Sequence, residues 1–181
     1  MKLSIVIPMY NEEGIIQTLF QRLEHTKALF NRKFGMMSAD IEIIFVNDGS
    51  SDGTFDALKQ ICMQENNYQL LNLSRNHGHQ IAITAGIDLA TGDAVAVIDG
   101  DLQDPPETIV DLYGKLQDGF DVVYAVRKKR EGETAFKLFT AKLFYRLLKK
   151  LTNVEIPVDT GDLDRKSTRL NSQSPCNLVC R

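Results

Sequence analysis

The sequence has few cysteines and no long apolar run, and both absences narrow the classes of protein it can belong to. Three cysteines, Cys62, Cys176 and Cys180, occur among 181 residues. None forms a Cys-x-x-Cys pair, so a reducing compartment is the simplest setting. No apolar stretch approaches the roughly 20 residues of a membrane-spanning helix, so we expect the chain as written not to cross a bilayer. The amino terminus continues from an apolar run into Asn11-Glu12-Glu13 without a cleavage site. This pattern indicates a first strand and not a signal peptide.

Two glycine-rich fingerprints are also missing. Gly-x-Gly-x-x-Gly does not follow the first predicted strand, and Gly-x-x-x-x-Gly-Lys-Ser/Thr does not occur. Neither a dinucleotide-binding fold nor a P-loop is therefore supported. The formal net charge of −3 and the pI near 5.6 argue against nucleic acid as a partner, because such binders normally carry a basic excess.

What the sequence does contain is ordinary globular composition with a regular alternation of segments. Hydrophobic residues make up 43% and charged residues 25%, and the length suits one domain with a sizeable core. Strands are predicted over 3–7, 41–46, 69–73, 94–98 and 121–126, and helices over 12–30, 52–64, 80–90 and 105–117, with 31–40 as a surface connection. This order predicts an α/β fold with a mostly parallel sheet and helices on both faces.

The stretch 94–107 contains the clearest chemical signal. An apolar run of strand length ends in Asp99 and Asp101. If the backbone stays extended through both residues, their carboxylates lie on one face, about one metal ion apart. We interpret Asp99 and Asp101, with Gln103 nearby, as the site of a divalent cation that bridges to a diphosphate. An ordinary solvated acidic loop is the alternative.

The same stretch predicts how the next helix begins. Asp104 reads as its N-cap, Pro105 as its first residue and Glu107 as the capping-box partner.

The other polar clusters also follow predicted strands, and the carboxyl ends of parallel strands meet at one edge of a sheet. Asp48 follows the second strand, His77 and His79 follow the third, and Arg127 and Arg130 follow the fifth. We interpret the two histidines as loop residues with satisfied hydrogen bonds. A diphosphate needs countercharge, which a metal and Arg127 or Arg130 would provide.

A nucleotide also needs partners for its base and ribose. Asp48 and Glu12 could accept hydrogen bonds, and Pro8 or Tyr10 could offer a flat apolar contact.

The carboxyl-terminal part has a different character. Residues 134–152 predict a basic amphipathic helix, which suits the surface of an anionic membrane, although packing on the sheet with a basic outer face is equally open. From Leu163 the chain is polar and aperiodic, which predicts disorder.

Four motifs in order carry a family resemblance. They are Pro8-Met9-Tyr10-Asn11-Glu12, Val46-Asn47-Asp48-Gly49-Ser50-Ser51-Asp52-Gly53-Thr54, Asp99-Gly100-Asp101-Leu102-Gln103-Asp104-Pro105-Pro106-Glu107 and Asp159-Thr160-Gly161-Asp162. Together they look like the family 2 glycosyltransferases that act on polyprenyl phosphates. The chain most resembles the bacterial bactoprenol glucosyltransferases, with dolichol-phosphate mannose synthases as relatives.

The resemblance implies a GT-A-type nucleotide-sugar-binding fold that uses Mg²⁺ or Mn²⁺ and transfers a sugar with inversion onto a lipid phosphate, at the cytoplasmic face of the plasma membrane. UDP-glucose is the preferred donor and GDP-mannose the second. Residues that match nucleotide-binding positions are Pro8, Tyr10, Glu12 and Asp48; those that match the metal and diphosphate motif are Asp99, Asp101 and Gln103.

The resemblance also suggests residues for the reaction itself. Arg127 and Arg130 match a basic position near the phosphates, and Asp162 or Asp159 falls where relatives place a proposed catalytic base. A phosphate oxygen is already largely anionic at neutral pH, since its second pKa is about 6, and needs positioning more than deprotonation. Asp162 could therefore orient the acceptor instead.

The chain departs from the family pattern after Asp162. Relatives continue Phe-Arg-Leu, then an acceptor region and, in bacteria, two membrane-spanning helices, whereas this chain continues Leu163-Asp164-Arg165. The run to Arg181 resembles translated vector sequence. We therefore expect residues 1–162 to be a donor-binding domain that is incomplete at its carboxyl end, and 163–181 to be a non-native disordered tail. An oligomer built through the missing helices stays open.

Two alternatives remain for the function. One is an inactive truncated nucleotide-sugar-binding fragment. The other is a phosphatase of the haloacid dehalogenase type, although its Asp-x-Asp normally follows the first strand.

Overall fold

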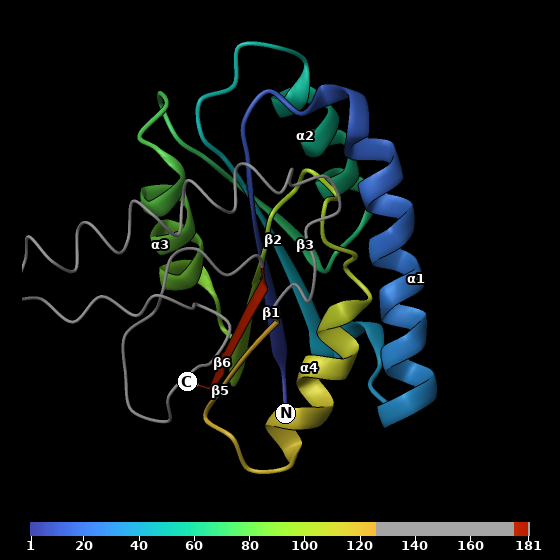
Figure 1. The fold of residues 1–181 in the computed structure, drawn as a ribbon. Coiled ribbons are helices and arrows are strands. Elements are labelled where there is room, and N and C mark those ends of the chain that lie inside the picture. The colour runs from blue at the N-terminus through green and yellow to red at the C-terminus, as the bar shows by residue number, and fades with distance from the viewer. Residues whose placement is uncertain (126–175, 181) are drawn as a thin grey trace, which may run out of the picture. The chain divides into compact units, whose positions relative to one another are not determined.

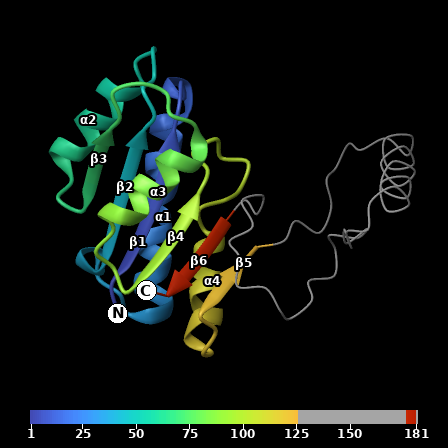
Figure 2. The ribbon, with the colours of Figure 1, turned by 90° about the vertical axis from the view of Figure 1, so that its left-hand side faces the viewer.

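The computed structural model describes residues 1–125 and 176–180. The strands in these residues form one six-stranded sheet. Its strands are β1 (Leu3–Met9), β2 (Ile41–Asn47), β3 (Tyr68–Asn72), β4 (Ala94–Ile98), β5 (Val122–Tyr124) and β6 (Cys176–Cys180). They lie in the order β3-β2-β1-β4-β6-β5, which Figure 2 shows. β1 pairs in parallel with β2 and β4, and β2 pairs in parallel with β3, while β6 is antiparallel to both of its neighbours.

Helices cover both faces of this sheet, as predicted. They are α1 (Ile16–Phe34), α2 (Thr54–Gln64), α3 (His79–Leu89) and α4 (Thr108–Gln117), with short 3-10 turns at Glu13–Ile15 and Ser38–Asp40. Helix α3 lies on one face, and α1 and α4 lie on the other (Figure 1). The described residues therefore have the α/β architecture that the alternating pattern predicts.

The core follows the two-residue period of the strands. Leu3, Ile5 and Ile7 of β1 belong to the larger buried cluster, which contains residues of α1, α2 and α4. Val6 belongs to the smaller cluster, which contains Ala82 of α3. Because both faces are covered, β1 and β2 are buried along their whole length, as parallel strands usually are.

Helix α1 lies further along the chain than predicted, since it begins at Ile16 and not at Glu12. It continues to Phe34, and Gly35, at a φ of 68°, ends it by donating its N–H to the Asn31 carbonyl. Phe34 packs edge-on against Tyr113 of α4, with ring centroids 5.1 Å apart. The first part of the expected surface connection 31–40 is thus helical, because the aromatic contact with α4 extends the buried face.

Helix α4 begins later than predicted. Its first residue is Thr108, its N-cap is Glu107, and no side chain caps it. The expected roles of Asp104 as N-cap and Pro105 as first helical residue are therefore wrong. The Glu107 carboxylate accepts hydrogen bonds from Arg22 of α1, at 2.7 and 3.2 Å, and takes no part in a capping box.

The expected disorder after Leu163 does not hold for Cys176–Cys180. These residues form β6, which pairs with β4 and β5. Backbone pairing with two strand edges that would otherwise carry unpaired N–H and C=O groups favours this strand. The remainder of the expected tail and the helix predicted over 134–152 lie outside the described residues. Within residues 1–125 and 176–180, no helix is long and apolar enough to span a bilayer.

Candidate functional site

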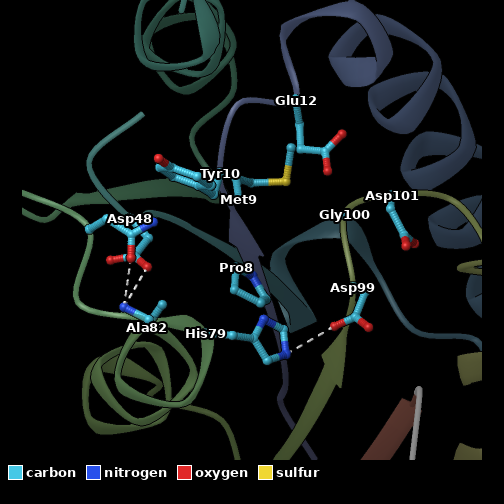
Figure 3. A pocket seen from close by; sticks show the side chains of 12 residues that line it. Pro8, Met9, Tyr10, Glu12, Asp48, His79, Ala82, Asp99, Gly100 and Asp101 are labelled. Atoms are coloured by element: carbon cyan, nitrogen blue, oxygen red, sulfur yellow. Dashed lines mark hydrogen bonds and ion pairs between the residues drawn. The ribbon is translucent and has the colours of Figure 1, made fainter. Parts of the chain in front are cut away.

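The loops after β1, β2, β3 and β4 meet around a cavity of about 280 Å³. Figure 3 shows it from close by. The residues that line it are Pro8, Met9, Tyr10, Glu12, Asp48, Asn76, Gly78, His79, Ala82, Asp99, Gly100 and Asp101. The prediction that polar clusters from separate strands converge at one edge of the sheet is confirmed for these loops. Such a crevice at the carboxyl ends of parallel strands is where open α/β sheets bind ligands.

Asp48 holds one wall of the cavity in place. Its side chain is buried, and its two carboxylate oxygens accept the backbone N–H groups of His77 and Gly78 at 2.7 and 2.9 Å. The backbone N–H of Asp48 donates to the Met9 carbonyl at 2.9 Å. Asp48 therefore connects the loops after β1, β2 and β3.

Gly49 permits the close approach of two of these loops. Its φ is 65°, and a Cβ at this position would lie 2.3 Å from the Arg75 carbonyl carbon. A residue with a side chain would be strained in this conformation and would also collide with backbone.

Asp99 and Asp101 both line the cavity, but not on an extended backbone. β4 ends at Ile98, the chain turns at Gly100, and Leu102 has a φ of 59°. The Asp101 carboxylate accepts a hydrogen bond from the N–H of Gln103 at 3.0 Å, and this contact stabilises the turn. The expectation of an extended segment through both carboxylates is therefore wrong. Gln103 is exposed and does not line the cavity.

The cavity is acidic. Glu12, Asp48, Asp99 and Asp101 contribute carboxylates, and His79 is the one side chain among its described lining residues that can become a cation. Burial raises the pKa of Glu12, and the nearby charges of Asp101 and Asp52 raise it further. An anionic ligand would therefore need additional positive charge to bind here.

His79 was not expected to belong to this site. It is the first residue of α3, and its Nε2 lies 3.4 Å from Asp99 Oδ1, the contact drawn as a dashed line in Figure 3. The sequence pattern alone indicates an ordinary loop residue with satisfied hydrogen bonds. Its place at the carboxyl end of a strand was the signal that could have identified it.

The described carboxylates do not form a complete metal site by themselves. Within residues 1–125 and 176–180, no three His, Cys, Asp or Glu side chains gather closely enough to hold an ion. The other candidate residues, Arg127, Arg130, Asp159 and Asp162, lie outside the described residues.

Curated proteins with similar sequences are glycosyltransferases by name. The chain is 46% identical to "Uncharacterized glycosyltransferase YkcC" of Bacillus subtilis, over 95% of this chain and 53% of that protein. It is 38% identical to "Prophage bactoprenol glucosyl transferase homolog" of Escherichia coli, over 90% of this chain and 51% of that protein. The chain thus spans about half the length of the curated relatives it matches.

Solved structures with a similar fold include one in complex with UDP-GlcNAc and one in complex with GDP-Man. Staphylococcus aureus TarS in complex with UDP-GlcNAc aligns with a TM-score of 0.57 and 24% identity, over 75% of this chain and 37% of that one. The mannosyltransferase PcManGT of Pyrobaculum calidifontis in complex with GDP-Man and Mn²⁺ aligns with a TM-score of 0.59 and 21% identity, over 72% and 36%. The fold is therefore of the GT-A type, as expected.

The sequence model described as Glycosyl transferase family 2 matches residues 4–164, which is most of the chain. The Asp-Gly-Asp motif follows β4, next to β1 in the sheet, and not the first strand that a haloacid dehalogenase phosphatase would use. With the GT-A-type fold and the similarity to named glycosyltransferases, these findings lead to one conclusion: the chain belongs to glycosyl transferase family 2.

Proposed function

We propose that this chain carries the donor-binding part of an inverting glycosyltransferase that moves a sugar from a nucleotide sugar to a polyprenyl phosphate. The observation that carries the proposal is the convergence of Pro8, Tyr10, Glu12, Asp48, Asp99 and Asp101 around one cavity. The name of the Escherichia coli relative supports a bactoprenol acceptor. The proposal includes sugar transfer by this chain, which spans about half the length of those relatives.

The nucleoside would bind between the loops after β1 and β2. Tyr10 is 47% exposed and lies at the cavity, where its ring can stack on a base. Glu12 can accept hydrogen bonds from the base or ribose. Asp48 retains acceptor capacity beyond the two N–H groups that it already binds, since an ionised carboxylate has about four lone-pair sites.

The diphosphate would bind on the other side of the cavity, with Mg²⁺ or Mn²⁺ held by Asp99 and Asp101. Hard carboxylate oxygens suit these ions, and Mg²⁺ is usually bound by one or two carboxylates together with substrate phosphates. Two lining carboxylates without a third close protein ligand among the described residues fit that mode. The cation would also offset the charge of Asp101, which, after burial, raises the pKa of Glu12. When bound, it would stabilise the charge of the departing diphosphate.

Residues outside the described part would complete the reaction. Arg127 and Arg130 would add countercharge to the departing diphosphate. Asp162, or less favourably Asp159, would orient the acceptor phosphate for attack from the face opposite the leaving group. The basic segment 134–152 would contact anionic lipid at the cytoplasmic face of the plasma membrane.

We propose UDP-glucose as the donor substrate, with GDP-mannose as the second candidate. Isothermal titration of the full chain with each nucleotide sugar, with and without Mn²⁺, tests this choice. We expect one of them to bind only with Mn²⁺. Asp101→Ala should abolish the binding, since it removes one of the two carboxylates proposed to hold the ion.

Asp118→Ala is the matched control. It removes the same charge from an exposed position at the end of α4, where Asp118 contacts only Lys115 among the hydrogen bonds seen. It should bind like the wild type. Failure of a folded wild-type chain to bind either nucleotide sugar would contradict the donor site, and binding that ignores Mn²⁺ would contradict the role of the cation. Transfer of labelled sugar to undecaprenyl phosphate then tests turnover.

A further inference from the structure

The loops after β1 and β2 are joined by a set of hydrogen bonds that lies outside the cavity. Asn11 N–H donates to Ser50 Oγ at 3.0 Å, and Asn11 Oδ1 accepts the N–H of Ser51 at 2.8 Å. Glu12 N–H donates to Thr54 Oγ1 at 2.8 Å. We call residues 10–13 the first loop and residues 50–54 the second loop.

Glu13 extends the same set of contacts. Its N–H donates to Asp52 Oδ2 at 3.2 Å, and its carboxylate accepts the N–H of Gly53 at 2.9 Å. A Cβ on Gly53 would lie 2.5 Å from Glu13 Oε1, so the two loops approach closely here. The hydrogen bonds run in both directions between the loops, and the loops therefore hold each other in place.

The first loop presents alternate residues to two different surroundings. Tyr10 and Glu12 line the cavity, whereas Asn11 and Glu13 do not and bind the second loop instead. Asn11 adopts a left-handed conformation with a φ of 55°, which asparagine tolerates better than most residues. A backbone held in this unusual conformation by side-chain contacts indicates a built arrangement.

From this alternation we propose that Asn11, Glu13 and Thr54 are positioning residues, which hold Tyr10 and Glu12 in the geometry that binds the nucleotide. The inference rests on the proposed function. Without these contacts the first loop would have to be ordered when the nucleotide binds, and that ordering would weaken affinity. A merely structural role would lower thermal stability and leave the affinity of the folded protein unchanged.

Thr54 offers a matched pair of uncharged substitutions. Its side chain is fully buried, and Thr54→Val removes both the acceptor of the Glu12 N–H and the hydroxyl that hydrogen-bonds Asp52, while keeping the shape. Thr54→Ser keeps the hydroxyl and removes a methyl group. We expect Thr54→Val, which removes the hydrogen bonds of the hydroxyl, to weaken UDP or GDP binding in MnCl₂ by about fivefold, and Thr54→Ser to stay within about twofold.

Asn11→Gly is the second variant, for the case that Thr54→Val does not fold. Asn11 is exposed, and glycine accommodates its backbone conformation without strain, so this substitution removes the side-chain acceptor and also makes the backbone of the first loop freer. We again expect about fivefold weaker binding. Wild-type affinity in folded Thr54→Val and Asn11→Gly would overturn the proposal.

Hydrogen exchange of the free chain separates this inference from the proposed function. Asn11→Gly should speed exchange at the N–H groups of Glu12 and Glu13, although their own acceptors, Thr54 and Asp52, remain. Unchanged exchange at both positions would show that the contacts do not hold the first loop. If the wild type binds neither UDP nor GDP but this coupling is present, the proposed function fails and the connection between the loops is supported.

Discussion

Replacing Asp48 with asparagine should loosen the wall of the cavity. In the wild type, both carboxylate oxygens are used, one by the N–H of His77 and one by the N–H of Gly78. Asparagine presents one carbonyl oxygen and one NH₂ group. One of the two backbone donors would then face another donor and lose this acceptor, although the N–H of Gly78 also donates to Asn76 Oδ1 at 2.9 Å.

The magnitude follows from the burial of the groups involved. A hydrogen bond to a charged acceptor contributes about 1.5–3 kcal/mol, and the buried position of Asp48 favours that range. His77 is exposed and Gly78 is half-buried, so water can partly replace the lost acceptor. We therefore expect a loss of about 1–2 kcal/mol in the free energy of unfolding, and a melting temperature lower by about 2–8 °C.

Differential scanning calorimetry of Asp48→Asn and the wild type at pH 7 measures this change. Asp118→Asn is the control, since it makes the same chemical change at an exposed side chain, and it should melt within about 1 °C of the wild type. Hydrogen exchange at the N–H groups of His77 and Gly78 should be faster in Asp48→Asn alone. An unchanged melting temperature together with unchanged exchange at these two groups would refute the reasoning.

Three further predictions concern the charged side chains of Glu42, Glu12 and the pair Arg22 and Glu107. Burial alone would raise the pKa of Glu42, but hydrogen bonds from Ser4 and Thr91 and the charge of Lys2 outweigh it and lower the pKa below its usual 4.5. The stability from ionised Glu42 is thus present above pH 4.5 and is lost as the pH falls through the lowered folded value, so Glu42→Gln should flatten this acid loss in urea unfolding followed against pH. Glu12 has a raised pKa, so its charge costs stability above that value and none below 4.5. Glu12→Gln should therefore raise the melting temperature at pH 7 by about 1–2 °C, but not at pH 4. It should also weaken nucleotide-sugar binding in isothermal titration with Mn²⁺. Arg22 and Glu107 form a half-buried pair with two hydrogen bonds, and a double-mutant cycle of Arg22→Ala and Glu107→Ala in urea unfolding should give a coupling of about 1 kcal/mol, whereas additive effects would contradict it.

Much of the fold could be predicted because it depends on local patterns. Apolar runs such as Ala94–Ile98 are long enough for strands and too short for helices, and their alternation with amphipathic segments predicts a parallel sheet. The right-handed crossover then places Asp48 and Asp99 at one edge without knowledge of any contact between them. The ends of elements were less predictable. Helix α4 starts at Thr108 and not at Pro105, and Glu107, expected to cap it locally, binds Arg22, which lies far away in the sequence.

The sequence by itself determined the alternating α/β architecture and the identity of the polar residues at the ends of its strands. This is because the hydrophobic periodicity of a few neighbouring residues indicates whether a segment forms a helix or a strand. Only the tertiary structure decided which partner each polar side chain takes. Asp48 binds the turn after β3, His79 lies against Asp99, and Asn11 binds Ser51. These choices depend on distances between segments far apart in the chain, and a hydrogen bond forms only where packing brings its donor and acceptor to about 3 Å.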